Sequence, residues 1–267
     1  MLPGNRLSPA TVAAVGALRA SGVAFVPASA RTKAGLVSAL TPVLPDVSAA
    51  ICCNGAIGLG PGGASVIWQE FFADGVVADF AAVLSGMDGA GLAVYDGDGW
   101  ALSPEYAAAF GDWHTGLQFV LPLAELGGRP ASFLGAHHPD LTAAELAAVL
   151  TSTGLFAGRA TITYAADQIV NISPAGADKG TGARRALAAL GIAAADAVGF
   201  GDAGNDLPLA AALGRFVAVE NADPRLLAIA DETTGPAGED GVAAWLVRAG
   251  LELELRAGDD ARSALAR

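Results

Sequence analysis

The chain has 267 residues, of which 53% are hydrophobic and 16% charged, and its formal net charge is −12. This composition excludes a disordered chain, and the acidic excess excludes a basic nucleic-acid-binding surface. No apolar run reaches the roughly 18 residues of a membrane-spanning helix, and the N-terminus does not resemble a signal peptide. The two cysteines, Cys52 and Cys53, are adjacent, which excludes a disulfide framework. We therefore expect a cytoplasmic protein with neither a membrane nor a nucleic acid as partner.

The N-terminal part alternates between signals for helices and for buried strands. Ser8 and Pro9 are typical of a helix start, and Gly22 is typical of a helix end. The expected elements are, in order, a helix over residues 11–20, a strand over 23–26, a helix ending near residue 40 and a strand over 49–53. This order predicts a parallel sheet with crossover helices.

The middle of the chain has a different texture, with many Gly and Pro breaks and all three histidines. The expected elements are strands over residues 65–72 and 91–95 and helices over 76–84 and 142–151. The letters of residues 58–63 match GxGxxG, but a strand rather than a helix follows them, so we expect a hinge or hairpin and no dinucleotide site. We interpret this part as an inserted α+β domain.

The parallel pattern returns near the C-terminus. The expected elements are strands over residues 169–172, 197–200 and 215–219 and helices over 179–190, 207–213, 224–230 and 241–249. The predicted organisation is therefore a core formed by residues 1–59 and 166–250, an inserted domain over 60–165, and a charged, frayed tail over 251–267.

The segment Gly201–Asp206 carries the sharpest chemical signal. It follows an apolar strand and opens a helix, so it lies at the carboxyl end of a strand, where open α/β sheets bind ligands. Asp202, Asn205 and Asp206 offer oxygen ligands of the kind that Mg²⁺ prefers. An acidic turn that also caps the next helix explains the same residues equally well.

Other polar residues are expected at the same edge of the sheet. Lys179 begins a helix, where its charge and the helix N-terminus would both attract a phosphate. Ser29 and Arg31 follow the first strand, and Asn54 follows the second. Taken singly, each fits a plainer interpretation better: a surface lysine, a helix cap or a turn.

The histidines and tryptophans of the middle part have no metal-binding spacing. We expect His114, His137 and His138 in exposed loops, with a substrate contact from a lid as the alternative for them. Trp100 and Trp113 are expected to be core residues.

Taken together and in order, these segments resemble the haloacid dehalogenase superfamily, in particular its Cof-type, subfamily IIB phosphatases. The segments that carry the resemblance are Leu7–Val15, Ala28–Arg31, Cys53–Ala56, Asp178–Gly180, Gly201–Asp206, Glu220–Ala222 and Glu239–Val242. The resemblance implies a Rossmann-like core with an inserted cap domain. It also implies Mg²⁺-dependent transfer of a phosphoryl group from a small phosphorylated metabolite, such as a sugar phosphate, first to an aspartate and then to water.

The resemblance further implies a role for each matching residue. Those expected to be catalytic are Ser29, Lys179 and Asn205; those expected to bind substrate are Arg31 and Asn54; those expected to hold Mg²⁺ are Asp202 and Asp206. Neither the substrate's identity nor the oligomeric state follows from these motifs.

One motif of the family is missing from the sequence. The family's first strand ends in Asp-x-Asp-Gly-Thr, which supplies the nucleophile, and the nearest match here, Asp96–Trp100, lies in the predicted cap and lacks the threonine. We expect that the gene begins upstream of Met1 and encodes this first strand. The alternative is a catalytically dead or truncated relative that keeps only phosphate and metal binding.

Overall fold

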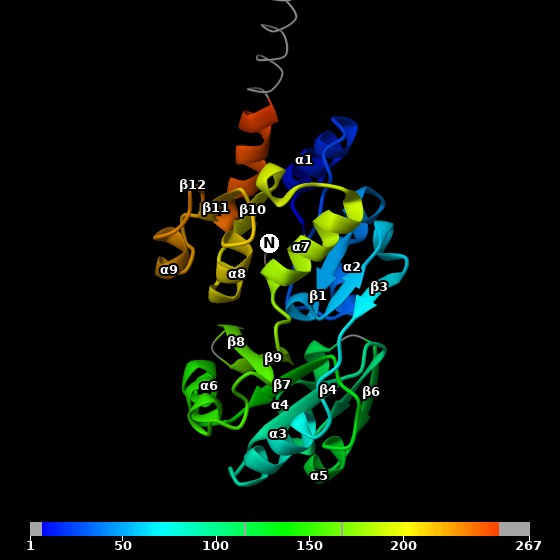
Figure 1. Cartoon of the computed structure of the whole chain (residues 1–267), viewed down its shortest axis with the longest axis vertical. Helices are drawn as coiled ribbons and strands as arrows, with labels where there is room; N and C mark the ends of the chain where they lie inside the picture. The colour runs from blue at the N-terminus through cyan, green and yellow to red at the C-terminus, as the bar shows by residue number, and fades with distance from the viewer. Residues whose placement is uncertain (1–6, 115, 167, 251–267) are drawn as a thin grey trace, which may run out of the picture.

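The structure is a computed structural model that describes residues 7–114, 116–166 and 168–250. It has two lobes stacked along its longest axis (Figure 1). The upper lobe in that view combines the N-terminal and C-terminal parts of the chain, and the lower lobe contains the middle part. The expected α/β class with an inserted unit is thereby confirmed. The tail predicted over residues 251–267 lies outside the described residues.

Helix-capping residues set where several helices begin. The Ser8 hydroxyl accepts a hydrogen bond of 2.9 Å from the Thr11 amide, and a proline occupies the first helical position of α1. Asp178 and Thr181 form a reciprocal capping box at the start of α7. The elements of the upper lobe are α1 (Pro9–Ala20), α2 (Lys33–Leu40), β1 (Ala50–Cys52), β2 (Ile57–Leu59), β3 (Val66–Gln69), α7 (Lys179–Leu190), β10 (Val198–Gly201), α8 (Leu207–Ala210), β11 (Arg215–Val219), α9 (Pro224–Leu227), β12 (Glu232–Thr234) and a helix over residues 241–250.

The upper lobe contains the expected parallel strands. β10, β11 and β12 form a parallel three-stranded sheet. In place of the predicted strand over residues 23–26, the segment 23–28 forms two isolated parallel bridges, Phe25 to Val47 and Ala28 to Ile51. Its carboxyl end therefore runs alongside β1, as the parallel arrangement requires.

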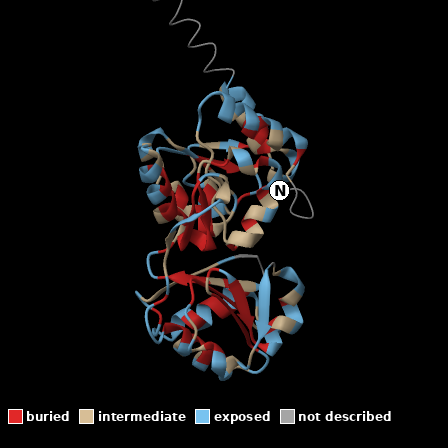
Figure 2. Ribbon diagram, turned by 90° about the vertical axis from the view of Figure 1, so that its right-hand side faces the viewer, coloured by how far each residue is buried: buried red, intermediate tan, exposed pale blue. Residues whose placement is uncertain are grey.

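The lower lobe is built on one six-stranded sheet of order β6-β5-β4-β7-β9-β8. Its elements are α3 (Val76–Ser85), β4 (Gly91–Tyr95), β5 (Gly99–Leu102), α4 (Pro104–Phe110), β6 (Leu117–Val120), α5 (Leu123–Leu126), β7 (Phe133–His137), α6 (Ala143–Ser152), β8 (Ala160–Ala166) and β9 (Ile169–Pro174). The helices α3, α5 and α6 pack their apolar residues against the sheet, and Figure 2 shows buried residues along the interior of this lobe.

Two strands lie in different sheets from those expected. β9 was predicted as a strand of the parallel core, but it pairs antiparallel with β7 and β8, so it belongs to the inserted unit. β3, expected within the inserted unit, pairs with β2 and extends the β1 sheet. A short apolar run has the same sequence pattern in either kind of sheet, and only the partner strands distinguish the two.

A continuous apolar cluster joins the two lobes. Tyr95, Trp100 and Phe133, on the face of the six-stranded sheet opposite α3, belong to the same buried cluster as Leu36 of α2 and Cys52 of β1. The inserted unit is therefore seated on the upper lobe by buried apolar surface, which positions its residues against the loops that follow the core strands.

Within residues 7–114, 116–166 and 168–250, we find no helix that is both long and apolar enough to span a membrane.

Candidate active site

The start of α7 holds Lys179 next to the loop that follows β10. Asp178 caps the helix by accepting a 2.7 Å hydrogen bond from the Thr181 amide, which fixes Lys179 as the first helical residue. Gly180 permits close approach of α8, because a Cβ at this position would lie 2.1 Å from the Pro208 carbonyl oxygen. The helix start and the 201–206 loop are therefore brought into contact by backbone packing.

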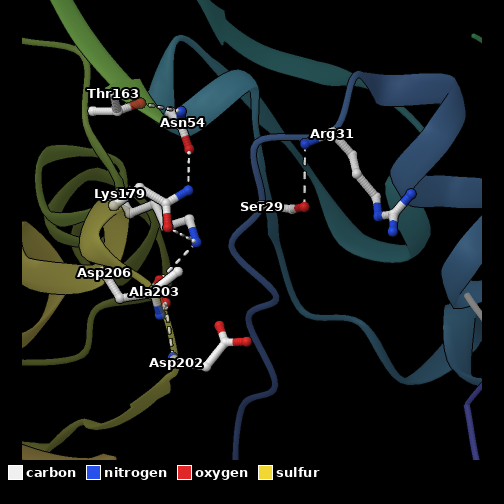
Figure 3. A network of polar contacts seen from close by, with 9 residues as sticks. Ser29, Arg31, Asn54, Thr163, Lys179, Asp202, Ala203 and Asp206 are labelled. Atoms are coloured by element: carbon white, nitrogen blue, oxygen red, sulfur yellow. Dashed lines mark hydrogen bonds and ion pairs between the residues drawn. The ribbon is translucent and has the colours of Figure 1, made fainter. Parts of the chain in front are cut away.

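The loop after β1 approaches the same place. Cys53 and Asn54 both have a φ of 51°, in the left-handed region, and Gly55 has a φ of 106°. A Cβ on Gly55 would lie 2.1 Å from the Asp178 carbonyl oxygen, so only glycine allows this loop to meet the start of α7. The strained turn directs the buried Asn54 side chain toward Lys179 and its neighbours (Figure 3).

A network of buried polar side chains links these loops (Figure 3). The Lys179 ammonium donates to Asp206 Oδ1 at 2.6 Å and to Asn205 Oδ1 at 3.3 Å. The Asn205 amide in turn donates to Asn54 Oδ1 at 3.1 Å. These four side chains are all buried. Because a buried charge is costly unless paired, the Lys179–Asp206 ion pair is what allows an ammonium group to lie here.

Ser29 joins the network through its backbone. Its carbonyl oxygen accepts a 3.0 Å hydrogen bond from the Asn54 amide, and its hydroxyl oxygen accepts one of 3.1 Å from the Arg31 amide. The Ser29 hydroxyl proton has no acceptor among the described residues, so it is available to a ligand. Burial lowers the pKa of the Arg31 guanidinium from its ordinary value.

The two carboxylates of the 201–206 loop differ sharply. Asp206 is buried, and while its Oδ1 accepts from Lys179, its Oδ2 accepts hydrogen bonds from the amides of Asp202 and Ala203 at 3.0 and 3.2 Å. Asp202 is exposed, and within the described part of the chain its carboxylate has no hydrogen-bond partner. In Figure 3 its side chain extends away from Asp206 and Lys179.

The oxygen donors of the 201–206 loop can bind a hard cation through one carboxylate, that of Asp202. Mg²⁺ in proteins is held by one or two carboxylates and keeps several waters and substrate phosphate oxygens as its other ligands. Asp202 meets that requirement, whereas Asp206 already accepts three hydrogen bonds. No group of three or more metal-binding side chains occurs among residues 7–114, 116–166 and 168–250.

The inserted unit contributes a residue that the sequence did not single out. Thr163, on β8, accepts a 3.2 Å hydrogen bond from the Asn54 side-chain amide and lies 3.4 Å from the Asn171 carbonyl oxygen of β9. Thr163 thus connects the lower lobe directly to the polar network. Nothing in its sequence neighbourhood distinguishes it from other strand threonines, because its role depends on how the two lobes meet.

A cavity of about 540 Å³ lies beside the same loop, between α2 and the six-stranded sheet. Arg31 and Thr32 line its upper-lobe side, and Trp100 and His114 line its lower-lobe side. We expected His114 in an exposed loop, but it is half-buried, with its ring centroid 4.1 Å from that of Trp100. Trp100 is buried as expected, whereas Trp113, at 65% exposure, is not a core residue.

The one Asp-x-Asp-Gly match in the sequence has a local structural role. Asp96 lies between β4 and β5, and its Oδ1 accepts hydrogen bonds from the amides of Asp98 and Gly99 at 3.0 and 2.9 Å. Asp98 forms a 3.1 Å ion pair with Lys33. This carboxylate pair therefore closes a hairpin turn and does not belong to the network around Lys179.

Comparison with curated proteins finds relatives over part of the chain. A phosphoglycolate phosphatase of Methanothermobacter thermautotrophicus is 38% identical over 74 residues, which is 28% of this chain and 34% of that protein. The protein YkrA of Bacillus subtilis is 37% identical over 81 residues, 30% of this chain and 32% of its own length. The matches thus span about a third of these two relatives.

Comparison with solved structures and with family sequence models covers nearly the whole chain. The subclass IIB sugar phosphatase BT4131 superposes with a TM-score of 0.79 at 22% identity, over 92% of each chain. TM0651 from Thermotoga maritima superposes with a TM-score of 0.72 at 24% identity, again over 92% of each. Residues 3–246 match the sequence model of the haloacid dehalogenase-like hydrolases. The chain with this buried lysine network and seated inserted unit therefore belongs to the haloacid dehalogenase-like hydrolase family.

Proposed function

We propose that this protein is a Mg²⁺-dependent phosphatase that acts on a small phosphorylated metabolite. One observation carries the proposal: Lys179, Asn205 and Asp206 are joined by hydrogen bonds to Asn54 and to the loop that holds Ser29. These groups come from four separate segments, and such convergence at the carboxyl ends of strands is typical of a ligand site. The names of a phosphoglycolate phosphatase and a sugar phosphatase among the similar proteins support the same reaction class.

Each side chain has a chemical task in this proposal. Lys179 uses two of its three N–H donors on Asn205 and Asp206, which leaves one for a phosphoryl oxygen. The Ser29 hydroxyl donates its free proton to a second phosphoryl oxygen. Phosphoryl transfer needs positioning and neutralisation of negative charge above all, and a buried ammonium held in place supplies both.

The remaining polar residues have two tasks: Asn54 and Asn205 position Lys179, and Arg31 contacts the substrate. Asn205 and Asn54 hold the lysine in register with the Ser29 loop. Arg31 lines the adjacent cavity, and in this proposal its guanidinium contacts the leaving group of the substrate.

We propose that Asp202 holds Mg²⁺ and that Asp206 positions the loop. When bound, Mg²⁺ neutralises charge on the phosphoryl oxygens. The prediction assigned both aspartates to the metal, but the hydrogen bonds that occupy both oxygens of Asp206 favour a positioning role for it. Asp206 orients the Asp202 backbone through the amide hydrogen bond of 3.0 Å.

A second candidate function is phosphate binding without turnover. It is favoured by the sequence, which lacks Asp-x-Asp-Gly-Thr. Of the two carboxylates in the 201–206 loop, only that of Asp202 has no hydrogen-bond partner among the described residues. The covalent step of the first candidate function needs the nucleophilic carboxylate that Asp-x-Asp-Gly-Thr supplies in the family.

The experiment compares this chain with a longer protein to which an N-terminal strand ending in Asp-x-Asp-Gly-Thr has been added. Both are assayed with 4-nitrophenyl phosphate and Mg²⁺, and inorganic phosphate binding is measured by calorimetry. We expect both proteins to bind phosphate and only the longer one to turn over substrate. Equal turnover by the two proteins contradicts the account of the nucleophile. If Ser29→Ala and Lys179→Met both still bind inorganic phosphate as tightly as the unaltered chain, the proposed phosphate site is wrong.

The Asp202→Asn variant tests the metal assignment. In the longer protein we expect Mg²⁺-dependent turnover to fall by at least about 100-fold, because the only free carboxylate of the loop is lost. The free energy of unfolding should change by less than about 0.5 kcal/mol, since Asp202 is exposed and unpartnered. A Mg²⁺ titration of turnover provides the measurement, and an unchanged titration curve removes Asp202 from the metal site.

A further inference from the structure

The cavity between α2 and the six-stranded sheet is the second feature of the lobe interface. Five of its lining residues carry aromatic rings, among them Trp100, Trp113 and His114. Its volume of about 540 Å³ falls within the 300–1,000 Å³ typical of small-molecule sites. Arg31 lines the cavity and donates its backbone N–H to the Ser29 hydroxyl, so the cavity adjoins the loop proposed to hold the phosphoryl group.

Two ring nitrogens of residues that line the cavity have no hydrogen-bond partner within residues 7–114, 116–166 and 168–250. They are Nε1 of Trp100, a residue only 3% exposed, and Nε2 of His114. A buried polar atom without a partner is destabilising, and native structures contain few of them. Two such atoms on neighbouring rings, 4.1 Å apart by their centroids, mark a place where a ligand could supply the missing partners.

We propose that this cavity receives the leaving group of the substrate, and that this group is a planar nitrogen heterocycle. The inference rests on the proposed phosphatase function and names the class of substrate within it. The ring stacks against the aromatic wall, an acceptor atom of the ring takes the Trp100 N–H, and a second polar atom pairs with His114 Nε2.

The chemistry of the wall favours a flat ring over a sugar. Flat rings stack on aromatic side chains, and each such pair contributes binding free energy beyond that of the apolar area it buries. A sugar presents several hydroxyl donors that need acceptors, but the described lining includes no carboxylate, and its side-chain acceptors apart from His114 are Thr32, Ser38, Asn171 and the phenol oxygen of Tyr106. The indole N–H, in contrast, requires an acceptor, which a heterocyclic nitrogen provides.

Ring contacts hold His114 in the cavity wall. No side-chain hydrogen bond holds its imidazole in the described part of the chain; its ring centroid lies 4.1 Å from that of Trp100, tilted by 36°, and 5.5 Å from that of Tyr106, stacked at 19°. Its burial lowers its pKa to about 4, so the ring is neutral at pH 7 and presents either a donor or an acceptor at Nε2. Because both nitrogens are buried in the structure, a ligand reaches them only when the imidazole turns off the indole.

The test compares four phosphate monoesters of similar size by calorimetry without Mg²⁺, so that binding is measured without turnover. They are pyridin-3-ylmethyl phosphate, benzyl phosphate, cyclohexylmethyl phosphate and glucose 6-phosphate, with inorganic phosphate as the reference. The benzyl ester keeps the flat ring and removes the nitrogen, and the cyclohexyl ester removes the flat ring. We expect the pyridyl ester to bind at least tenfold more tightly than the cyclohexyl ester and than glucose 6-phosphate, with the benzyl ester between them.

Two variants locate the effect in the cavity. Trp100→Phe keeps a ring and removes the N–H, so it should weaken the pyridyl ester about five- to tenfold and leave the benzyl ester and inorganic phosphate unchanged. Trp113→Ala changes a residue that is 65% exposed at the cavity and so should fold normally. It should weaken both aromatic esters several-fold and spare inorganic phosphate.

The outcomes separate this inference from the proposed function. If inorganic phosphate fails to bind, the proposed function is wrong, and the cavity is then judged with pyridin-3-ylmethanol and cyclohexylmethanol by ligand-observed NMR. If phosphate binds but the cyclohexyl ester or glucose 6-phosphate binds as tightly as the pyridyl ester, the heterocycle inference is overturned. The same holds if neither variant changes the preference among the esters.

Discussion

The two sides of the lobe interface differ in how completely their polar atoms are partnered. Around Lys179, four buried side chains from three segments are joined to one another by hydrogen bonds of 2.6–3.3 Å. In the neighbouring cavity, two buried ring nitrogens on Trp100 and His114 have no hydrogen-bond partner among the residues that the structure describes. Both regions adjoin the segment from Ser29 to Arg31.

This difference matches the two parts of a phosphate monoester. The phosphoryl group is the same in every such substrate, so a rigid network that keeps one Lys179 N–H donor free can hold it without adjustment. The leaving group varies, and a wall of aromatic rings with loosely held members can select it. In this interpretation the upper lobe carries the chemistry and the inserted unit carries the selectivity.

The largest expected effect comes from disrupting the hydrogen-bonded network around Lys179. Asp206→Asn leaves the Lys179 ammonium buried without its counter-charge, because the 2.6 Å ion pair is lost. Removing one partner of a buried pair costs about 3–5 kcal/mol of unfolding free energy. Urea denaturation followed by circular dichroism measures this loss.

Asp202→Asn is the matched control for that measurement, because it makes the same chemical change four residues away on an exposed carboxylate. The two variants should differ in unfolding free energy by at least about 3 kcal/mol. Equal, small losses would show that Lys179 and Asp206 are solvated in solution, and the contrast between the two sides of the interface would then disappear.

The sequence predicts the residues of the Lys179 network far better than it predicts the residues that line the cavity. Lys179, Asp202 and Asn54 each stand next to a strand end or helix start, and parallel strands bring such ends to one edge, so their convergence follows from local patterns. The cavity depends instead on how β5 and the segment that contains His114 pack against α2. That packing is a long-range contact between lobes, and no local pattern encodes it.

The strand β9 shows the same limit within the fold itself. Val170 and Ile172 are buried as expected of a core strand, but the cluster they enter is that of the inserted unit. The apolar pattern correctly predicts burial and a strand, and it leaves open which of two apolar surfaces covers the strand. Domain boundaries drawn from sequence texture inherit that ambiguity.

An intermediate effect is expected on the cavity side from acidification. Burial lowers the pKa of His114 to about 4 in the folded state, below the ordinary value of 6.5 that applies to the unfolded chain. Between these values the unfolded chain binds the extra proton, so stability falls as pH falls from about 6.5 to 4. His114→Phe keeps a ring against Trp100 and cannot take up a proton.

We therefore expect the variant to lose less stability than the unaltered protein between pH 7 and pH 4.5. The difference should be about 1–2 kcal/mol, a discounted value because the half-buried imidazole is partly screened by water. Urea denaturation at the two pH values gives the four free energies required. Parallel losses in both proteins would mean that the His114 imidazole is solvated, as an exposed loop histidine would be.

The smallest expected effect concerns the link between the two sides. Thr163 accepts the Asn54 side-chain amide at 3.2 Å and lies 3.4 Å from the carbonyl of Asn171, a residue that lines the cavity. Thr163→Val keeps the shape of the side chain but leaves a buried Asn54 N–H donor without a partner. The expected loss is about 1 kcal/mol of unfolding free energy, measured by urea denaturation.

Thr163→Ser separates the hydroxyl from the methyl group, since it restores the acceptor for Asn54 and removes only a methyl. It should recover most of the stability lost in Thr163→Val, and inorganic phosphate should bind it with unchanged affinity. In the valine variant we expect phosphate affinity to fall a few-fold, because Asn54 also accepts from Asn205, which in turn holds Lys179. If valine and serine behave alike in both measurements, the hydroxyl does not connect the inserted unit to the lysine network, and the two sides of the interface act independently.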